Sequence, residues 1–253
     1  MIWFKLTSKC NKMIFSHKNL REFFREIHRL GRTELFKNWK GDRVFLLRHD
    51  IDFDINLAHK MAQIEAEENL VSTFFILTTC ESYNVLSTKN KQLLREILGM
   101  GHEVGLHFDP TIYEKDLELA VKQECELLSF AINCEIKSIS LHNPSVHGLY
   151  PMFENYVNAY DPKMFSNENY ISDSRFSFRG KNPFEFIKGI DNSMIQILLH
   201  PMHYSELGSG YKEIMFSTFM RYINDVHCNF KTNNVYVEQV GEDINEGFKS
   251  FIK

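Results

Sequence analysis

The sequence predicts an α/β protein built on a parallel sheet, and three features support this prediction. Short apolar runs recur along the chain, and they alternate with longer segments that have helical periodicity. Such alternation is typical of βαβ units, whose strands are buried on both faces. Polar residues gather at the carboxyl ends of the apolar runs. These are the ends at which parallel α/β sheets bind ligands.

The elements follow one another in chain order. A helix is expected at 18–30, because its apolar residues recur at helical spacing: Leu20, Phe23, Phe24, Ile27 and Leu30. The buried strands expected from apolar runs are 43–48, 71–78, 102–108, 136–142 and 194–200, with a last short strand at 235–240. The further helices are expected at 55–69, 88–99, 113–132 and 214–230. Residues 143–193 hold four prolines and are expected to form long functional loops with short elements. The chain is therefore predicted to be one domain, 1–253, in which 1–42 is a helical N-terminal extension.

Composition excludes several classes of protein. The 253 residues are 43% hydrophobic and 25% charged, which excludes disordered and fibrous chains. The net charge of −4, without any basic block, argues against a nucleic-acid partner. No run of eighteen apolar residues occurs, so no membrane span is expected, and the N-terminus lacks the apolar core of a signal peptide. The five cysteines include no C-x-x-C pair, which favours reduced thiols and a cytoplasmic location.

Histidines and carboxylates cluster where the predicted strands end. The clusters are His49-Asp50-Ile51-Asp52, His107-Phe108-Asp109, His142-Asn143 and His200-Pro201-Met202-His203. In a parallel sheet these ends converge on one face. A single histidine at a strand end is ordinary core packing, but this set forms a candidate site.

The Asp-x-Asp pair lies where a strand opens into a loop. There Asp50 and Asp52 can both face one site, one as a base and the other as a cation ligand. The alternative is an Asx turn or a cap for helix 55–69, for which Asp54 is the better candidate.

Two strand-end histidines suit particular roles. His107, with a carboxylate two residues on, suits Zn²⁺ or a similar divalent ion. The alternative, a buried histidine that bonds a backbone carbonyl, fits His102 better. His200 suits a general acid, with core packing as the alternative.

Taken in order, the motifs resemble one family. RHDID (48–52), STFFILT (72–78), GHEVGLHFD (101–109), SISLHNPS (138–145), ISDSRF (171–176) and LLHPMHY (198–204) resemble the polysaccharide deacetylase superfamily, the NodB-type fold of carbohydrate esterase family four. The similarity spans about residues 43–205 and is greatest to divergent members found with surface-polysaccharide biosynthesis. It implies a distorted (β/α) barrel with fewer than eight strands, one divalent metal, usually zinc, and hydrolysis of an N-acetyl or related amide bond.

The resemblance also implies roles for individual residues. Asp50 corresponds to the general base, His200 to the general acid, and Asp52 and His107 to metal ligands. Asp173 and Arg175 lie where the family has a charged pair that orients the base. Arg175 is expected to pair with Asp50 and keep it ionised, and the alternative is a surface salt bridge between Arg175 and Asp173 alone. The residues expected to bind substrate are Asn143, Asp109, Tyr204 and His203, with Tyr150, Tyr170 and His147 as further candidates for a sugar cleft.

The chain departs from the family at the third metal ligand. The family has a second histidine four residues after the first, but here that position is Thr111. We favour His142 as the replacement, because it ends the next strand at the same face. Asp109 as an oxygen ligand, or a degraded and inactive site, are the alternatives.

These motifs are compatible with three functions. The first is a metal-dependent hydrolase that removes an N-acetyl or related acyl group from a sugar or polysaccharide precursor, with Zn²⁺ as the favoured metal. The second is a C–N hydrolase that acts on a non-sugar amide. The third is a catalytically silent glycan-binding protein of the same fold.

Overall fold

The structure is a computed structural model that describes residues 15–191 and 193–251. The chain divides after Gly208 into two compact units, 1–208 and 209–253, which are described separately. The first unit holds seven strands: β1 (Phe45–Ile51), β2 (Thr73–Ile76), β3 (Glu103–Phe108), β4 (Ser138–Leu141), β5 (Val157–Asn158), β6 (Tyr170–Ser172) and β7 (Ile195–Leu198). Its α-helices are α1 (His17–Leu30), α2 (Ile55–Glu67), α3 (Thr88–Gly99), α4 (Leu117–Ile132), α5 (Pro144–His147) and α6 (Pro183–Phe186). The second unit consists of α7 (Tyr211–Phe230), α8 (Asn234–Val240) and α9 (Ile244–Phe251).

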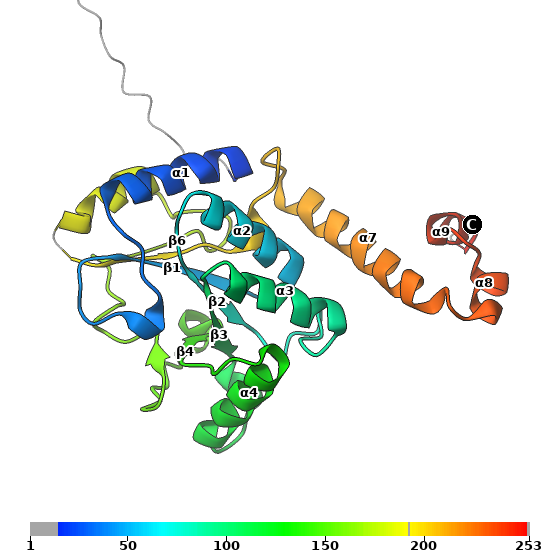
Figure 1. The fold of residues 1–253 in the computed structure, drawn as a ribbon, viewed down its shortest axis with the longest axis horizontal. Coiled ribbons are helices and arrows are strands. Elements are labelled where there is room, and N and C mark those ends of the chain that lie inside the picture. The colour runs from blue at the N-terminus through cyan, green and yellow to red at the C-terminus, as the bar shows by residue number, and fades with distance from the viewer. Residues whose placement is uncertain (1–14, 192, 252–253) are drawn as a thin grey trace, which may run out of the picture. The chain divides into compact units, whose positions relative to one another are not determined.

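The seven strands form one parallel sheet in the order β5-β4-β3-β2-β1-β7-β6. The sheet curls into a half-barrel that is open between β5 and β6, and helices α1 to α4 surround it (Figure 1). This confirms the predicted class, a distorted (β/α) barrel with fewer than eight strands. The predicted strands at 43–48, 71–78, 102–108, 136–142 and 194–200 are also confirmed.

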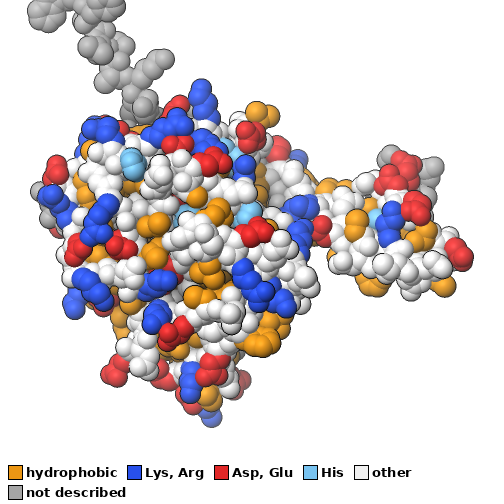
Figure 2. All heavy atoms as spheres, viewed as in Figure 1, with side chains coloured by type: hydrophobic (Ala, Val, Ile, Leu, Met, Phe, Trp, Pro, Cys, Tyr) orange, Lys and Arg blue, Asp and Glu red, His pale blue; other side chains and the backbone are white. Residues whose placement is uncertain are grey.

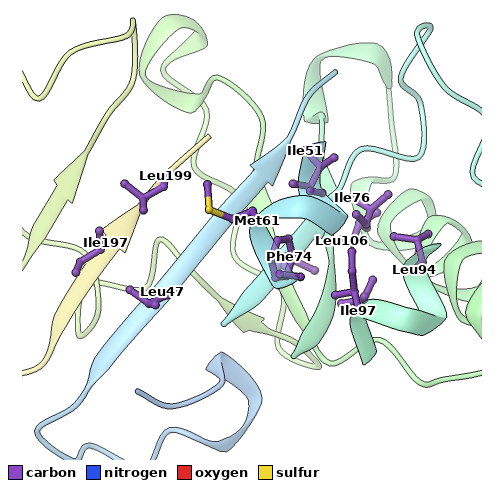
Figure 3. Close-up of a cluster of buried hydrophobic side chains, with 14 of the residues drawn as sticks. Leu47, Ile51, Met61, Phe74, Ile76, Leu94, Ile97, Leu106, Ile197 and Leu199 are labelled. Carbon is purple, nitrogen blue, oxygen red and sulfur yellow. The ribbon is translucent and has the colours of Figure 1, made fainter. Parts of the chain in front are cut away.

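The strands alternate between two environments. On the helix side, apolar side chains of β1, β2, β3 and β7 share one core with side chains of α2 and α3. Figure 3 shows members of this core, among them Phe74 and Met61 of α2, and Leu106 beside Ile97 of α3. On the concave side lies a smaller apolar cluster: Phe36, Val44, Leu46, Phe75, Ala159, Met164 and Met194. Beyond this cluster, toward the carboxyl ends of the strands, the concave face is polar, and the candidate site lies there.

Helix α1 belongs to the core of the first unit. Ser16 caps its N-terminus, and Leu20, Phe23, Phe24 and Ile27 have no exposed surface. The helix predicted at 18–30 is therefore confirmed, while residues 1–14 of the predicted extension lie outside the described residues.

Figure 2 shows that Lys and Arg are interspersed with Asp and Glu on the face drawn there. None of the described helices is long and apolar enough to cross a membrane.

The strand predicted at 235–240 is wrong, because this segment is helix α8. Asn233 caps the helix by accepting hydrogen bonds from the backbone N–H groups of Val235 and Tyr236. Gly241 follows the helix with a φ of 93°, a conformation that glycine adopts without strain. Cap residues at both ends therefore outweigh the β propensity of Val, Tyr and Val.

Candidate active site and metal centre

One small cavity, about 110 Å³ in volume, lies at the carboxyl ends of the strands. Asp50 and Asp52 reach it from the end of β1, His107 from β3, His142 from the end of β4 and His200 from the end of β7. The parallel pairing explains this convergence, because it brings residues far apart in sequence to one level of the sheet, for example His107 beside Ser140. The predicted convergence of strand-end residues is thus seen in the structure.

Three of these residues form a cluster suited to a metal. His107 Nε2 lies 3.1 Å from Asp52 Oδ1. His142 Nδ1 lies 3.4 Å from the same oxygen and 3.2 Å from His107 Nε2. Ligand atoms of a tetrahedral ion with bonds of about 2.0–2.1 Å lie about 3.3 Å apart. Asp52 Oδ1 is buried and accepts no well-aligned hydrogen bond from the described residues. The three atoms therefore fit a divalent cation.

Electrostatics keeps the carboxylate of the cluster ionised. Burial opposes ionisation of Asp52, but its interactions with His107 and His142 outweigh burial and hold the pKa of the carboxyl well below its usual value. Burial likewise opposes the charged form of His142, but Asp52 outweighs it and raises the pKa of the imidazole. The carboxylate is therefore ready to bind a cation at neutral pH.

The other nitrogen of each imidazole has a hydrogen-bond partner. His107 Nδ1 lies 2.6 Å from Ser140 Oγ, and Ser140 Oγ donates to Asp50 Oδ1 at 3.2 Å. His142 Nε2 lies 2.8 Å from the side-chain amide nitrogen of Asn143, which donates to it. Because Ser140 donates its own hydrogen to Asp50, it accepts from His107 Nδ1, and this contact fixes the tautomer that leaves His107 Nε2 free for a metal.

Thr111, which stands at the family's ligand position, and Asp109, the alternative ligand, both lie apart from this cluster. The Thr111 hydroxyl donates to Asp109 Oδ1 at 2.6 Å, and the Thr111 backbone N–H donates to the same oxygen at 2.9 Å. Asp109 thus caps the 3₁₀ helix Pro110–Ile112, so neither side chain lines the cavity. The geometry brings His142 to the cluster in their place.

Asp50 is held by Arg48, two residues upstream on the same face of β1. Arg48 Nε and Nη2 donate to the two carboxylate oxygens at 2.9 and 2.8 Å. The guanidinium also donates to the side-chain oxygen of Gln196 at 3.3 Å and to the Tyr160 hydroxyl at 3.0 Å. Burial raises the pKa of Asp50, but the charges of Arg48 and His107 outweigh it, and the net pKa is lowered. Asp50 is therefore ionised and fixed in orientation.

The prediction that Arg175 pairs with Asp50 does not match this geometry. Arg175 is exposed in the loop after β6 and does not line the cavity. Arg48 takes the place expected for it, since residues two apart on a strand share a face. The sequence contains this signal in the alternation of Arg48 and Asp50, although the motif RHDID draws attention only to its two carboxylates.

His200 forms a dyad with Asp173. Its Nδ1 lies 2.6 Å from Asp173 Oδ1, and its backbone N–H donates to both carboxylate oxygens at 3.1 Å. The 2.6 Å separation is too short for two ligands of one ion, so the pair shares a proton and not a metal. Burial disfavours the imidazolium, but Asp173 outweighs burial and raises the pKa of His200 to about 9. The sequence predicts that Asp173 orients the base, whereas in the structure it orients His200.

The four residues expected to bind substrate do not all line the cavity. Asn143 does so. His203 is buried, with Nδ1 3.3 Å from Asp173 Oδ2, and Tyr204 is buried in the core. His203, Tyr204, His147 and Asp109 do not line the cavity.

One wall of the cavity is aromatic. Tyr150, Tyr160, Phe165 and Tyr170 form a continuous series, in which successive ring centroids are 5.7, 4.8 and 4.7 Å apart. The sequence predicts Tyr150 and Tyr170 for a sugar cleft, but it does not reveal Tyr160 and Phe165. These two lie in irregular loops, where no periodic pattern marks them.

The fold resembles solved structures of carbohydrate esterase family 4, or CE4. No protein-family model and no curated protein matches the sequence. A CE4 esterase of Streptococcus mutans is 15% identical, with a TM-score of 0.43, and 88% of this chain and 90% of that chain are covered. A peptidoglycan deacetylase of Bacillus subtilis is 14% identical, with a TM-score of 0.41 and coverage of 80% and 98%. A CE4 family pseudoenzyme of Bacillus anthracis is 13% identical, with a TM-score of 0.42 and coverage of 73% of this chain but only 62% of that chain. This chain therefore spans less than two thirds of the length of the pseudoenzyme. The motifs of this chain resemble the same family, CE4.

Proposed function

We propose that the protein is a metal-dependent hydrolase that removes an N-acetyl or related acyl group from a sugar or glycan precursor. The observation that carries this proposal is the convergence of Asp52, His107 and His142 beside an ionised carboxylate, Asp50, and a protonated imidazole, His200. These are the parts that amide hydrolysis requires: a cation site, a base and an acid.

Asp52, His107 and His142 would hold the metal. Their mixed nitrogen and oxygen ligands favour Zn²⁺. When bound, the metal supplies Lewis acidity, which stabilises negative charge on the amide oxygen and acidifies water.

Asp50 and His200 would move the protons. Asp50 lies beside the ligand cluster, with Oδ2 3.8 Å from His107 Nε2, and accepts a proton from the attacking water. His200 Nε2 lies 3.9 Å from Asp52 Oδ2, on the cavity side of the ring, and donates its proton to the leaving nitrogen. Arg48 and Asp173 keep the two groups in these opposite protonation states. The aromatic wall offers ring faces on which a sugar ring can stack.

The first test is metal content. Elemental analysis of protein purified without chelator or nickel resin is expected to give about one divalent ion per chain, and the His142→Ala variant is expected to lose it. His28→Ala, which removes an exposed imidazole on α1, is the matched control and is expected to keep the metal.

The second test is acetate release from N-acetylated sugars. Release by the wild type and its loss in Asp50→Asn, with metal retained, would support the assignment of Asp50 as the base. Metal binding without hydrolysis of any sugar amide would reject the proposal in favour of the non-sugar hydrolase or the silent glycan-binding protein. Absence of metal, even after Zn²⁺ is added, would reject the metal site itself.

A further inference from the structure

The loop between β6 and α6 has an unusual backbone. Arg175, Phe176 and Arg179 have φ values of 62°, 56° and 51°, in the left-handed region that residues with a side chain rarely adopt. Three such residues within five positions indicate a loop whose shape is imposed by its surroundings. Strain of this kind concentrates at ligand-binding segments.

The same loop holds two arginines whose guanidinium groups have no partner among the described residues. Among the described residues, every other arginine contacts a carboxylate or a backbone carbonyl: Arg21, Arg25, Arg29, Arg32, Arg43, Arg48, Arg95 and Arg221. Within the same described ranges, only Arg175 and Arg179 have none. Two such guanidiniums on one strained loop leave positive charge without a countercharge.

Arg179 brings that charge to the cavity. It lines the same cavity as Asp50, Asp52 and His107, and no other Lys or Arg side chain among the described residues does so. The carboxylates nearby already have other partners, since Asp50 pairs with Arg48, Asp173 with His200, and Asp52 with His107 and His142. The charge of Arg179 is therefore available to a ligand.

We propose that Arg179 binds an anionic group, a phosphate or a carboxylate, on the substrate while the aromatic wall contacts the sugar ring. A guanidinium binds either group through two parallel hydrogen bonds, and so it selects anionic substrates over neutral ones. This inference rests on the proposed function, and it narrows the substrate class to N-acylated sugars that are phosphorylated or acidic.

The test compares three probes by isothermal titration calorimetry on the zinc-loaded full chain. The probes are N-acetylglucosamine, N-acetylglucosamine 1-phosphate and N-acetylmuramic acid. At least one anionic probe is expected to bind about tenfold more tightly than the neutral sugar, since one charge-assisted contact is worth at least that factor. The probe that gains more identifies phosphate or carboxylate as the preferred group.

Variants identify the residue responsible. Arg179→Gln is expected to remove the preference for the anionic probe, whereas Arg179→Lys is expected to keep part of it. Lys163→Gln removes an exposed cation that does not line the cavity, so it is expected to leave the preference unchanged. Thermal unfolding of each variant establishes that it is folded.

Two outcomes would overturn the inference. Equal binding of neutral and anionic probes by the wild type is the first. The second is an anionic preference that survives Arg179→Gln, which would indicate that the anion binds the metal directly. Either outcome can occur in a protein that still releases acetate, and this would overturn the inference but not the proposed function. Conversely, a protein that releases no acetate can still prefer the anionic probe, so the two proposals are tested separately.

Discussion

At the scale of single residues, alternation along β1 determines the chemistry of the site. Arg48 and Asp50 point to the concave face, and both are almost fully buried. A buried carboxylate without a partner is strongly unfavourable, and Arg48 supplies both a countercharge and two hydrogen bonds. The same pair that keeps the proposed base ionised therefore also stabilises the fold.

Arg48→Leu is expected to lower the free energy of unfolding by about 3–5 kcal/mol, because it leaves Asp50 buried without its partner. The folded pKa of Asp50 is depressed, so the pair's contribution is fully present above the unfolded value of about 3.9. It is lost as the pH falls from there through the lower folded value. Urea titrations at neutral and acidic pH measure both effects.

The matched control for Arg48 is Arg175, an exposed arginine. Arg175→Gln is expected to change the free energy of unfolding by no more than about 0.5 kcal/mol. Equal losses in the two variants would contradict the assignment of Arg48, and a larger loss in Arg175→Gln would restore the expected Arg175–Asp50 pair.

The His200–Asp173 dyad predicts a pH dependence of catalysis. The general acid must be protonated, so kcat/KM is expected to fall as the pH rises through about 9, the pKa to which Asp173 raises His200 against the effect of burial. Asp173→Asn removes the countercharge and is expected to move this alkaline limb toward the ordinary histidine value of about 6.5. Rate profiles of both proteins on one N-acetylated sugar measure the limb. An unchanged limb in the variant would show that His200 is not the acid.

At the scale of elements, long periodic segments are predictable from the sequence and short ones are not. The five apolar runs correspond to β1, β2, β3, β4 and β7, because buried parallel strands require continuous apolar sequence. The edge strands β5 and β6 comprise two and three residues, too few for any period to show. They exist because neighbouring strands offer a free edge, which is information that the local sequence does not contain.

The site is predictable to the same extent as the elements that carry it. Asp50, Asp52, His107, His142 and His200 end recognisable strands, and the structure brings them together. Tyr160 and Arg179 lie in irregular loops whose path depends on distant contacts.

Gly105 illustrates a close contact between residues that are far apart in sequence. A Cβ atom at this position would lie 2.7 Å from both the Phe75 ring and the Ser138 carbonyl oxygen. The glycine therefore lets β2, β3 and β4 approach one another beneath His107. This requirement comes from the packing of three strands, so the local sequence around Gly105 does not reveal it.

At the scale of the whole molecule, the candidate site belongs to the first unit alone. The cavity is lined by residues between Asp50 and His200, and the described buried residues of both hydrophobic clusters lie between Leu20 and Tyr204. Residues 209–253 form their own unit of three helices within the described part of the chain. The prediction of one domain spanning 1–253 is therefore open to a direct experiment.

Limited proteolysis is expected to cut the chain near Leu207, which is 88% exposed and lies just before the first unit ends at Gly208. The resulting fragment 1–208 is expected to unfold in one cooperative transition and to retain its metal, because it holds the complete sheet, both clusters and all three ligand residues. Calorimetry and elemental analysis of the purified fragment measure these properties. A fragment that is unfolded or metal-free would show that residues 209–253 complete the domain. In that case the single-domain prediction would be correct, and the fold that holds the site would depend on residues 209–253.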